Sequence, residues 1–294
     1  MKAAGQLGYF KGVPNGLITN ELKDAEARSW TGTILVLFPN VRYQNTDSLY
    51  WGPVFNGISS RLNQKGLNIL TLTEPTDDSM FSLLNPEAIR GIITVGTVST
   101  TILLEIKRLG IPVVMVDHLD SSFHCDTVFT DNISCMREIM VELIRKGYKR
   151  FQFIGNIKEA QSFYERWLGF RSVLDDYNIE LNQIPELIGP FEHVYDTLIE
   201  AVKQHGLPDV FVCANDSHAL FSIEALEAIG INVPDQCRLT GFDNTYPTLP
   251  IAATVNIDKE LLGKRAVDQM LWRILNPNST FEKKLIQAEV MFKE

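Results

Sequence analysis

Short runs of β-branched and aliphatic residues alternate with amphipathic segments along most of the chain, and this alternation constrains the fold more than any other feature. The first series predicts strands at 33–39, 67–73, 89–95, 111–116 and 127–130, with helices at 52–65 and 100–109. The second series predicts helices at 134–146, 163–176, 195–205, 217–229 and 259–276, and strands at 150–154, 187–189, 209–214, 237–241 and 285–292. Such alternation is typical of parallel sheets built from βαβ units. At 294 residues, the sequence predicts an α/β protein with two doubly wound parallel-sheet sub-domains and a ligand cleft between them.

The chain is acidic, with 27 Lys and Arg residues against 36 Asp and Glu residues and a net charge of −9. It contains no run of five or more basic residues. The phosphate backbone of a nucleic acid repels a protein of this overall charge. We therefore expect that the bulk of this chain does not hold nucleic acid by charge alone.

The sequence shows neither a membrane span nor an export signal. The longest apolar runs, such as 34–38 and 112–116, are as long as strands, whereas a membrane-spanning helix needs about 18 apolar residues. The first six residues lack the apolar core of a secretory signal. The four cysteines lack Cys-x-x-Cys spacing, so reduced, buried thiols are the simplest interpretation. We expect a soluble protein of the reducing cytoplasm.

Ligands of open α/β sheets bind beyond the carboxyl ends of the strands, at the loops that enter the next helix. Here those loops carry aromatic rings, carboxylates, amides and an arginine, among them Tyr50, Trp51, Asp117, Arg166, Phe191, Asn215, Asp216, Asp243 and Asn244. Aromatic faces pack on the C–H surfaces of sugars, and polar groups fix the hydroxyls. This combination indicates a polyhydroxylated ligand.

The sequence lacks the common motifs of catalysis, phosphate binding and metal binding. There is no GxSxG, GxGxxG, P-loop or HExxH pattern, and the five histidines show no metal-ligand spacing. Carboxylates such as Asp117 and Asp243 would suit the acid–base pair of a glycosidase, but no third catalytic partner accompanies them. We therefore expect a binding protein that is not an enzyme and uses no cofactor or metal.

Several motifs are more specific than this general pattern. Cys213-Ala214-Asn215-Asp216 leads through Gly230-Ile231-Asn232-Val233-Pro234 into Leu239-Thr240-Gly241-Phe242-Asp243-Asn244. Upstream stand Thr130-Asp131-Asn132, Lys146-Gly147-Tyr148 and Arg166-Trp167-Leu168-Gly169-Phe170. In this order the motifs resemble the ligand-binding core of the LacI/GalR family of bacterial transcription regulators, which is related to periplasmic sugar-binding proteins. The resemblance extends from about Thr31 to the end of the chain.

The resemblance implies roles for individual residues. Arg166 reaches into the cleft in this family, whereas the residues alone leave open a surface arginine paired with Glu165 or Asp175. Asp243 accepts ligand hydroxyls or else forms a turn, and both Arg166 and Asp243 are expected to touch little of the core. Asn215 is expected to bind ligand, and Asp216 is expected to cap the helix that starts at Ser217. The predicted ligand-binding residues are Tyr50, Trp51, Asp117, Ser162, Arg166, Phe191, Asn215 and Asp243.

Two further expectations concern packing near the cleft. Of Tyr50 and Trp51, one is expected to pack inward as part of the core. Phe221 stands where the family usually has a small residue, and we expect it to reshape packing near the cleft or the dimer face.

The amino-terminal residues Ala3-Ala4-Gly5-Gln6-Leu7-Gly8-Tyr9 look like the last helix and turn of that family's helix-turn-helix domain. The expected organisation is a remnant of the DNA-binding domain and hinge at 1–30, a first sub-domain at 31–132 plus about 258–280, and a second at 133–257 plus about 281–294. Operator DNA is therefore expected as a partner only of a full-length protein.

The function that the resemblance implies is that of the effector-binding and dimerisation core of a transcriptional repressor, sensing a mono- or disaccharide. Ligand between the sub-domains would favour one relative orientation, and in a homodimer this would decide whether two DNA-reading heads fit one palindromic operator. Apolar stretches at 223–229 and 271–275 either form the dimer faces or are buried within each sub-domain. The alternative function is that of a periplasmic sugar-binding protein that feeds a transporter.

Overall fold

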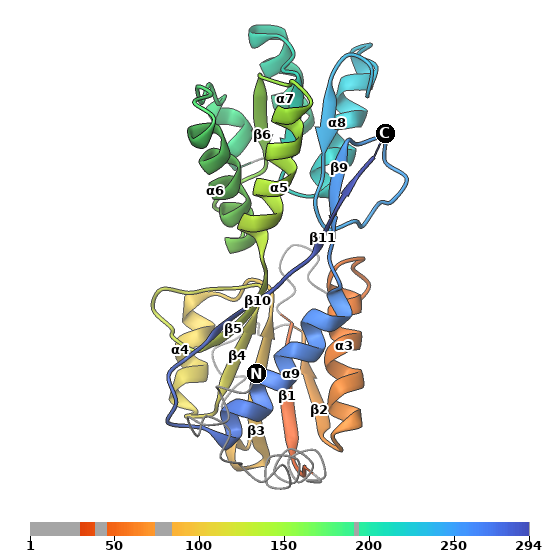
Figure 1. The fold of residues 1–294 in the computed structure, drawn as a ribbon. Helices are drawn as coiled ribbons and strands as arrows, with labels where there is room; N and C mark the ends of the chain where they lie inside the picture. Colours follow the sequence, from red (N-terminus) through yellow and green to blue (C-terminus); the bar gives the residue numbers. More distant parts are fainter. Residues whose placement is uncertain (1–29, 39–45, 74–83, 191–193, 294) are drawn as a thin grey trace, which may run out of the picture.

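The computed structural model describes residues 30–38, 46–73, 84–190 and 194–293. Within these residues the strands form a six-stranded and a five-stranded sheet, which lie in two lobes one above the other (Figure 1). The expected DNA-binding remnant at the amino terminus falls almost entirely outside the described residues. None of the described helices combines the length and apolar character of a bilayer span.

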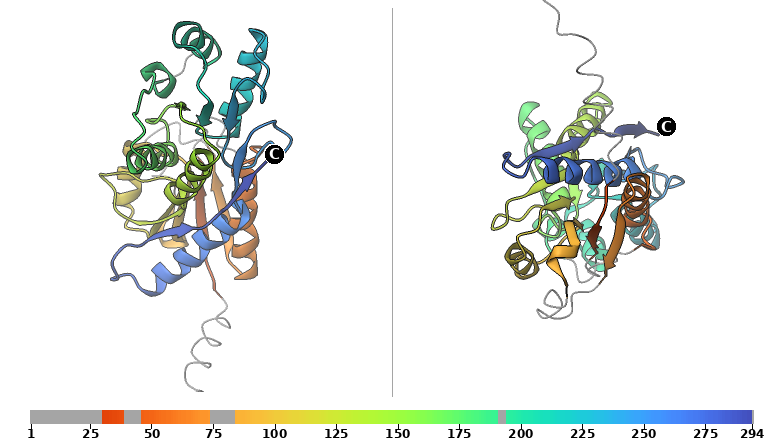
Figure 2. Two further views of the ribbon diagram at one scale, coloured as in Figure 1. Left: turned by 45° about the horizontal axis from the view of Figure 1, so that its top comes forward. Right: turned by 90° about the horizontal axis from the view of Figure 1, so that it is seen from below.

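The first sheet is parallel throughout and has the order β10-β5-β4-β3-β1-β2. Its strands are β1 (Thr33–Leu37), β2 (Asn68–Leu72), β3 (Ile89–Val95), β4 (Val113–Val116), β5 (Asp126–Thr130) and β10 (Lys283–Ile286). Helices α3 (Trp51–Gln64), α4 (Thr100–Arg108) and α9 (Lys259–Leu275) accompany it, together with the short 3-10 helix η2 (Pro86–Ala88). In Figure 2 the blue helix α9 lies beside the orange helix α3 on one face of this sheet, and α4 covers the other face.

The second sheet has the order β11-β9-β8-β7-β6, with only the edge strand β11 antiparallel. Its strands are β6 (Phe151–Ile154), β7 (Val210–Cys213), β8 (Arg238–Thr240), β9 (Ala253–Asn256) and β11 (Glu289–Phe292). Helices α5 (Asn132–Arg145) and α6 (Gln161–Asp176) cover one face, and α7 (Val194–His205) and α8 (Asp216–Ala228) cover the other. A 3-10 helix, η3 (Pro185–Ile188), precedes α7. The expected α/β class with two doubly wound sheets is confirmed.

Alternate residues of each strand pack into different cores, as a sheet covered on both faces requires. In β1, Ile34 and Val36 join the cluster formed with α3 and α9, whereas Leu35 and Leu37 join the cluster formed with α4. All four side chains are fully buried. This two-sided burial explains why the strands are continuous apolar runs rather than alternating ones.

The expected strand at 187–189 is wrong, because these residues belong to η3 or follow it. The amide of Gln183 takes the place of a neighbouring strand at the edge of the second sheet. Its Oε1 accepts from the Phe153 backbone N at 2.8 Å, and its Nε2 donates to the Phe153 backbone O at 3.0 Å. The Gln183 side chain thus bonds the backbone N and O of Phe153, which a neighbouring strand would otherwise bond.

The expected single strand at 285–292 is also wrong, because the chain there forms two strands in different sheets. β10 pairs with β5 of the first sheet, and β11 pairs with β9 of the second. The chain therefore crosses for the last time at 287–288, later than the expected boundary at about 281. Strand β9, which sequence patterning missed, provides the partner of β11.

A buried ion pair holds the segment before β10 in place. Arg273 donates from Nε and Nη2 to the carboxylate of Asp126, at 2.5 and 2.9 Å, and the two side chains are 4% and 0% exposed. Arg273 also donates to the backbone O atoms of Ser279 and Thr280. This arrangement ties the end of α9 and the following turn to β5.

The two apolar stretches considered as dimer faces are largely internal. Ile223 and Leu226 belong to the core under α8, and Leu271 belongs to the core under α9. Their exposures are 5%, 0% and 7%. These stretches therefore give no support to a dimer, because their apolar side chains are used within the sub-domains.

Helices α3 and α9 approach so closely that two glycines occupy their contact. A Cβ atom on Gly263 would lie 2.1 Å from the backbone O of Val54, and one on Gly57 would lie 2.1 Å from the backbone O of Glu260. Backbone atoms on both sides leave no flexible side chain that could move aside. The crossing therefore depends on the absence of a side chain at both positions.

We expect Gly263→Ala to destabilise the protein by about 1–3 kcal/mol, because overpacking outweighs the better helix propensity of alanine. Urea unfolding followed by circular dichroism measures the difference. Asn56→Ala on the exposed face of α3 is the matched control and should be neutral or slightly stabilising. A Gly263→Ala variant as stable as the control would show that the helices separate at no cost.

Candidate functional site

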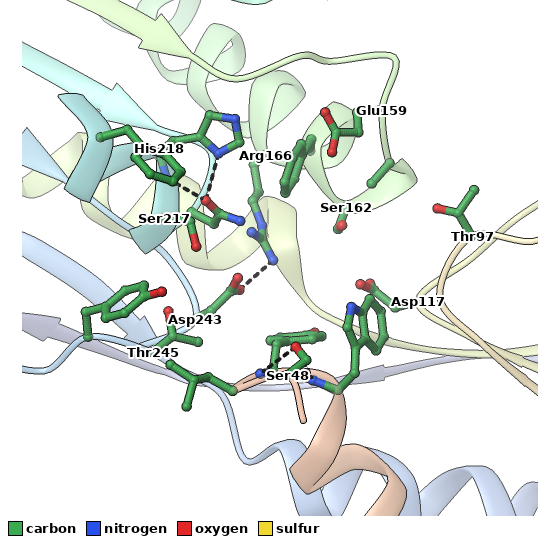
Figure 3. Close-up of a pocket in the computed structure, with 18 residues that line it drawn as sticks. Ser48, Thr97, Asp117, Glu159, Ser162, Arg166, Ser217, His218, Asp243 and Thr245 are labelled. Atoms are coloured by element: carbon green, nitrogen blue, oxygen red, sulfur yellow. Dashed lines mark hydrogen bonds and ion pairs between the residues drawn. The ribbon is translucent and has the colours of Figure 1, made fainter. Parts of the chain in front are cut away.

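A cavity of about 750 Å³ lies between the two sheets at the carboxyl ends of their strands (Figure 3). The first sub-domain contributes the residues before and at the start of α3, Thr97 after β3 and Asp117 after β4. The second contributes residues from α6 and from the loops after β6, β7 and β8. Seven predicted residues line this one cavity: Tyr50, Trp51, Asp117, Ser162, Arg166, Asn215 and Asp243. Phe191 lies outside the described residues.

Arg166 is 1% exposed, although it lines the cavity. Its Nη2 donates to Asp243 Oδ1 at 2.9 Å, its Nη1 to the Ala214 backbone O at 2.7 Å, and its Nε to Asn132 Oδ1 at 3.0 Å. The guanidinium carbon lies 3.7 Å from the centre of the Phe242 ring. The interpretation of Arg166 as a surface residue paired with Glu165 or Asp175 is wrong, and so is the expectation that it touches little of the core.

Asp243 is held as firmly as the arginine it binds. Its side chain is 9% exposed, its φ is 93°, and its backbone O accepts a short hydrogen bond from Lys259 Nζ at the start of α9. A positive φ is uncommon in residues other than glycine and asparagine, and such residues gather at functional sites. Lys259 stands in the first sub-domain, so this hydrogen bond also joins the two lobes.

The expected helix cap at Asp216 is wrong, whereas Asn215 lines the cavity as expected of a ligand-binding residue. Asn215 is the cap of α8, since its Oδ1 accepts from the His218 backbone N at 2.9 Å. Asp216 is fully buried and accepts from Thr254 Oγ1 and from the Thr245 backbone N, each at 2.7 Å. Asp216 therefore fixes the loop after β8, which carries Asp243, instead of capping the helix.

Asp117 lies on the opposite side of the cavity from Asp243, and Figure 3 shows Arg166 between them. It directly follows β4 with a φ of 55°, and its backbone N donates to the Val128 backbone O at 3.0 Å. Burial raises the pKa of its carboxyl to about 7, against the opposing effects of Arg166 and of the Ser162 hydroxyl. Asp117 is thus a carboxyl that titrates near neutrality at the edge of a cavity.

Tyr50 and Trp51 share the entrance to α3 but differ in their surroundings. Their rings meet edge to face with centroids 4.7 Å apart. Tyr50 packs against the cores of both sub-domains and its hydroxyl oxygen is buried, whereas Trp51 packs against the first core alone. Ser48 Oγ accepts from the backbone N of both residues at 3.2 Å, which fixes the turn that presents them.

Several residues that line the cavity were not predicted from the sequence as ligand-binding residues. Among them are Thr97, Glu159, Phe163, His218, Phe221 and Tyr246. Phe221 does lie at the cleft, although it is 51% exposed. His218 packs edge to face on Phe163, and burial lowers the pKa of its imidazole to about 4. The position of His218 three residues after Asn215 was the only available signal, because an α-helix brings such residues to one face. Within the described ranges, no group of three or more His, Cys, Asp and Glu side chains could hold a metal ion.

A chain of polar contacts runs from the cavity to the last crossing between the lobes. Asn132 accepts from Arg166 and donates from Nδ2 to Glu165 Oε2 at 3.0 Å. Glu165, which is 5% exposed, accepts at Oε1 from Lys283 Nζ at 2.6 Å. Lys283 belongs to β10 in the first sheet, whereas Glu165 belongs to α6 over the second. Arg166 is therefore connected through Asn132 to the salt bridge between Glu165 and Lys283, which joins the two lobes.

The sequence profile of the periplasmic binding protein-like domain family matches residues 141–294. The chain belongs to this family. One similar protein is the HTH-type transcriptional regulator GalR of Lacticaseibacillus casei. It is 24% identical over 261 residues, which cover 85% of this chain and 76% of the relative. In sequence, the chain is thus similar to the effector-binding part of a LacI/GalR-type regulator.

Solved structures of periplasmic binding protein-like regulators share its fold. The transcriptional regulator CelR in complex with cellobiose has a TM-score of 0.76 at 17% identity, covering 97% of this chain and 92% of that one. A LacI family regulator from Enterococcus faecium with bound ribose has a TM-score of 0.70 at 21% identity, covering 89% and 97%. The two-lobed fold of the family is therefore common to these proteins and to the present chain.

We expect Arg166→Met to lower the free energy of unfolding of the ligand-free protein by about 3–5 kcal/mol, because Asp243 is left as a buried charge without its partner. Asp243→Asn should likewise destabilise, and the double variant should lose less than the sum of the two. Urea unfolding measures all three variants.

Arg137→Met is the matched control, because Arg137 pairs with Asp176 at 2.8 Å on the exposed side of the same helix layer. A surface pair of this kind contributes about 0–1 kcal/mol. Equal losses for Arg166→Met and Arg137→Met would contradict the importance given to the buried pair.

Proposed function

We propose that this chain binds a mono- or disaccharide effector in the cavity and transmits binding as a change in the relative orientation of its two sub-domains. The observation that carries the proposal is the composition of the cavity. The buried pair Arg166–Asp243 stands on one side, the Asp117 carboxyl on the other, and the aromatic rings of Trp51, Phe163 and Tyr246 lie along the wall. Charged hydrogen-bonding groups and aromatic faces around one cavity suit a polyhydroxylated ligand.

The two lobes meet through few connections, and this suits a hinge. Within the described residues, the chain crosses between them three times, after β5, after β9 and after β10. Salt bridge Glu165–Lys283 and the hydrogen bond from Lys259 to Asp243 add contacts between the lobes. A ligand that contacts both sub-domains would favour the orientation in which it reaches both sets of residues.

In a homodimer, this change would alter the spacing of the amino-terminal sub-domains. That spacing would decide whether two DNA-reading heads of a full-length protein fit the half-sites of one operator. Regulation of transcription in the cytoplasm, without catalysis or a cofactor, is the function we propose. The alternative of a transporter's periplasmic sugar-binding protein is less favoured, because the matched relative GalR is a transcriptional regulator.

We expect one or more members of a panel of mono- and disaccharides to raise the melting temperature of the protein. A ligand at 100 times its Kd stabilises by about 2.7 kcal/mol. Trp51→Leu should weaken binding of that sugar about tenfold or more, because the cavity loses an aromatic face. Differential scanning fluorimetry and calorimetric titration measure both effects.

Tyr164→Leu is the control for the loss of an aromatic residue, since Tyr164 is 43% exposed and does not line the cavity. If no sugar stabilises the wild-type protein, the proposed ligand class is wrong. If a sugar binds Trp51→Leu as tightly as wild type, the ring is not part of the site.

We also expect the chain to be a dimer in solution at micromolar concentration. Light scattering should then give about twice the 33.2 kDa mass of one chain. A mass of one chain at that concentration would contradict the dimer and, with it, the proposed change in spacing.

A further inference from the structure

We propose that the effector carries a protonated amino group that binds Asp117, so that the cleft prefers an amino sugar to the neutral sugar of the same configuration. This inference rests on the proposed function and specifies the chemistry of the ligand. It follows from an acceptor without a partner and from the balance of charge in the cavity.

The acceptor is Asp117 Oδ1. The Asp117 side chain lines the cavity and the residue is only 6% exposed, yet Oδ1 is a buried oxygen with no hydrogen-bond partner among the described residues. Its backbone is fixed, since the Asp117 N donates to the Val128 O and the φ is 55°. A buried polar atom without a partner costs free energy. A donor from the ligand would remove this cost.

The side chains that line the cavity carry more negative than positive charge. Asp117 and Asp243 line the cavity, and among its described lining residues Arg166 is the one lysine or arginine. The guanidinium of Arg166 already binds Asp243, a backbone O and an amide O. Its charge is therefore committed to Asp243. His218, with a pKa of about 4, adds no positive charge near neutral pH.

The neighbouring lysines are also occupied. Lys259 donates to the Asp243 backbone O, and Lys283 binds Glu165. A phosphorylated sugar would thus place its anion beside Asp117 with no uncommitted cation among the described lining residues. A sugar hydroxyl could bind Oδ1 but would leave the carboxylate charge without a counter-ion. An ammonium group supplies both the charge and up to three N–H donors.

The protonation of Asp117 makes the preference measurable. Its carboxyl has a pKa of about 7, raised by burial and by Asp243 and Glu165, and lowered by Arg166 and by the hydrogen bond from the Ser162 hydroxyl. The titratable and charged groups around it are Arg166 and Glu165 from α6, Glu159 before α6, Asp243 after β8, Tyr50 before α3 and its own neighbour His118. A bound ammonium favours the ionised carboxylate. Below pH 7 the carboxyl must therefore lose a proton before the ligand binds.

The test compares matched pairs of sugars by calorimetric titration at pH 7.5 or so: glucose with glucosamine, galactose with galactosamine, mannose with mannosamine, and cellobiose with the β-1,4 dimer of glucosamine. In at least one pair the amino sugar should bind about 10- to 100-fold more tightly, as expected for a hydrogen bond to a charged group. Asp117→Asn keeps the shape and tolerates a positive φ, and it should abolish this preference. Asp120→Asn makes the same substitution three residues away, outside the cavity lining, and should retain it.

The pH dependence provides a second readout. With a carboxyl pKa of about 7, the affinity of wild type for the amino sugar should fall about tenfold between pH 7.5 or so and pH 6 or below. Asp117→Asn should show no such fall. If neutral sugars bind as tightly as their amino counterparts, the inference is overturned while the proposed function stands. If no sugar of either kind binds, both are overturned.

Discussion

The buried guanidinium of Arg166 is the interaction on which the cleft depends. A charge removed from water is costly unless it is paired and its donors are satisfied. Arg166 meets both conditions with groups from three separate elements: Asn132 at the start of α5, Ala214 at the end of β7 and Asp243 after β8. The ring of Phe242 supports its face. Because each of its partners comes from a different element, the full set of hydrogen bonds to Arg166 can form only when all three elements are in place. These hydrogen bonds hold this part of the cavity wall in one arrangement.

A second buried carboxylate explains why two of the sequence motifs occur together. Asp216 of the Ala-Asn-Asp motif binds Thr245 and Thr254, and its backbone N donates to the Phe242 backbone O at 2.9 Å. A Cβ atom on Gly241 would lie 2.0 Å from Asp216 Oδ1. The Gly-Phe-Asp-Asn motif therefore needs glycine at its first position because Asp216 occupies that space. The two motifs therefore pack directly against each other, and this contact positions Asp243 at the cavity.

Much of the fold could be predicted from the sequence, because strands buried on both faces and amphipathic helices leave strong local patterns. Prediction was wrong where the deciding partner is distant in the chain. Gln183 replaces a strand by bonding to Phe153, and 283–292 divides between sheets because β5 and β9 offer separate edges. The site followed the same rule. Loop position and the family resemblance together identified seven residues that line the cavity, but not the pairing of Arg166 with Asp243, which are 77 residues apart. These sequence signals also did not identify His218, whose ring is positioned in the cavity wall by Phe163 of another helix.

The geometry of α6 joins the cavity to the connection between the lobes. Arg166 faces the cavity and Glu165, its neighbour in sequence, faces β10 of the other sub-domain. Both side chains bind the same amide, since Asn132 accepts from one and donates to the other. Asn132 is also the first residue of α5, directly after the chain leaves the first sheet. A displacement of Arg166 by a ligand would therefore act on a residue at the first crossing and, through Glu165, on Lys283 before the last one. Packed interfaces tend to hold discrete arrangements rather than deform continuously. Under the proposed function, a small movement in the cavity would therefore bias the orientation of the lobes.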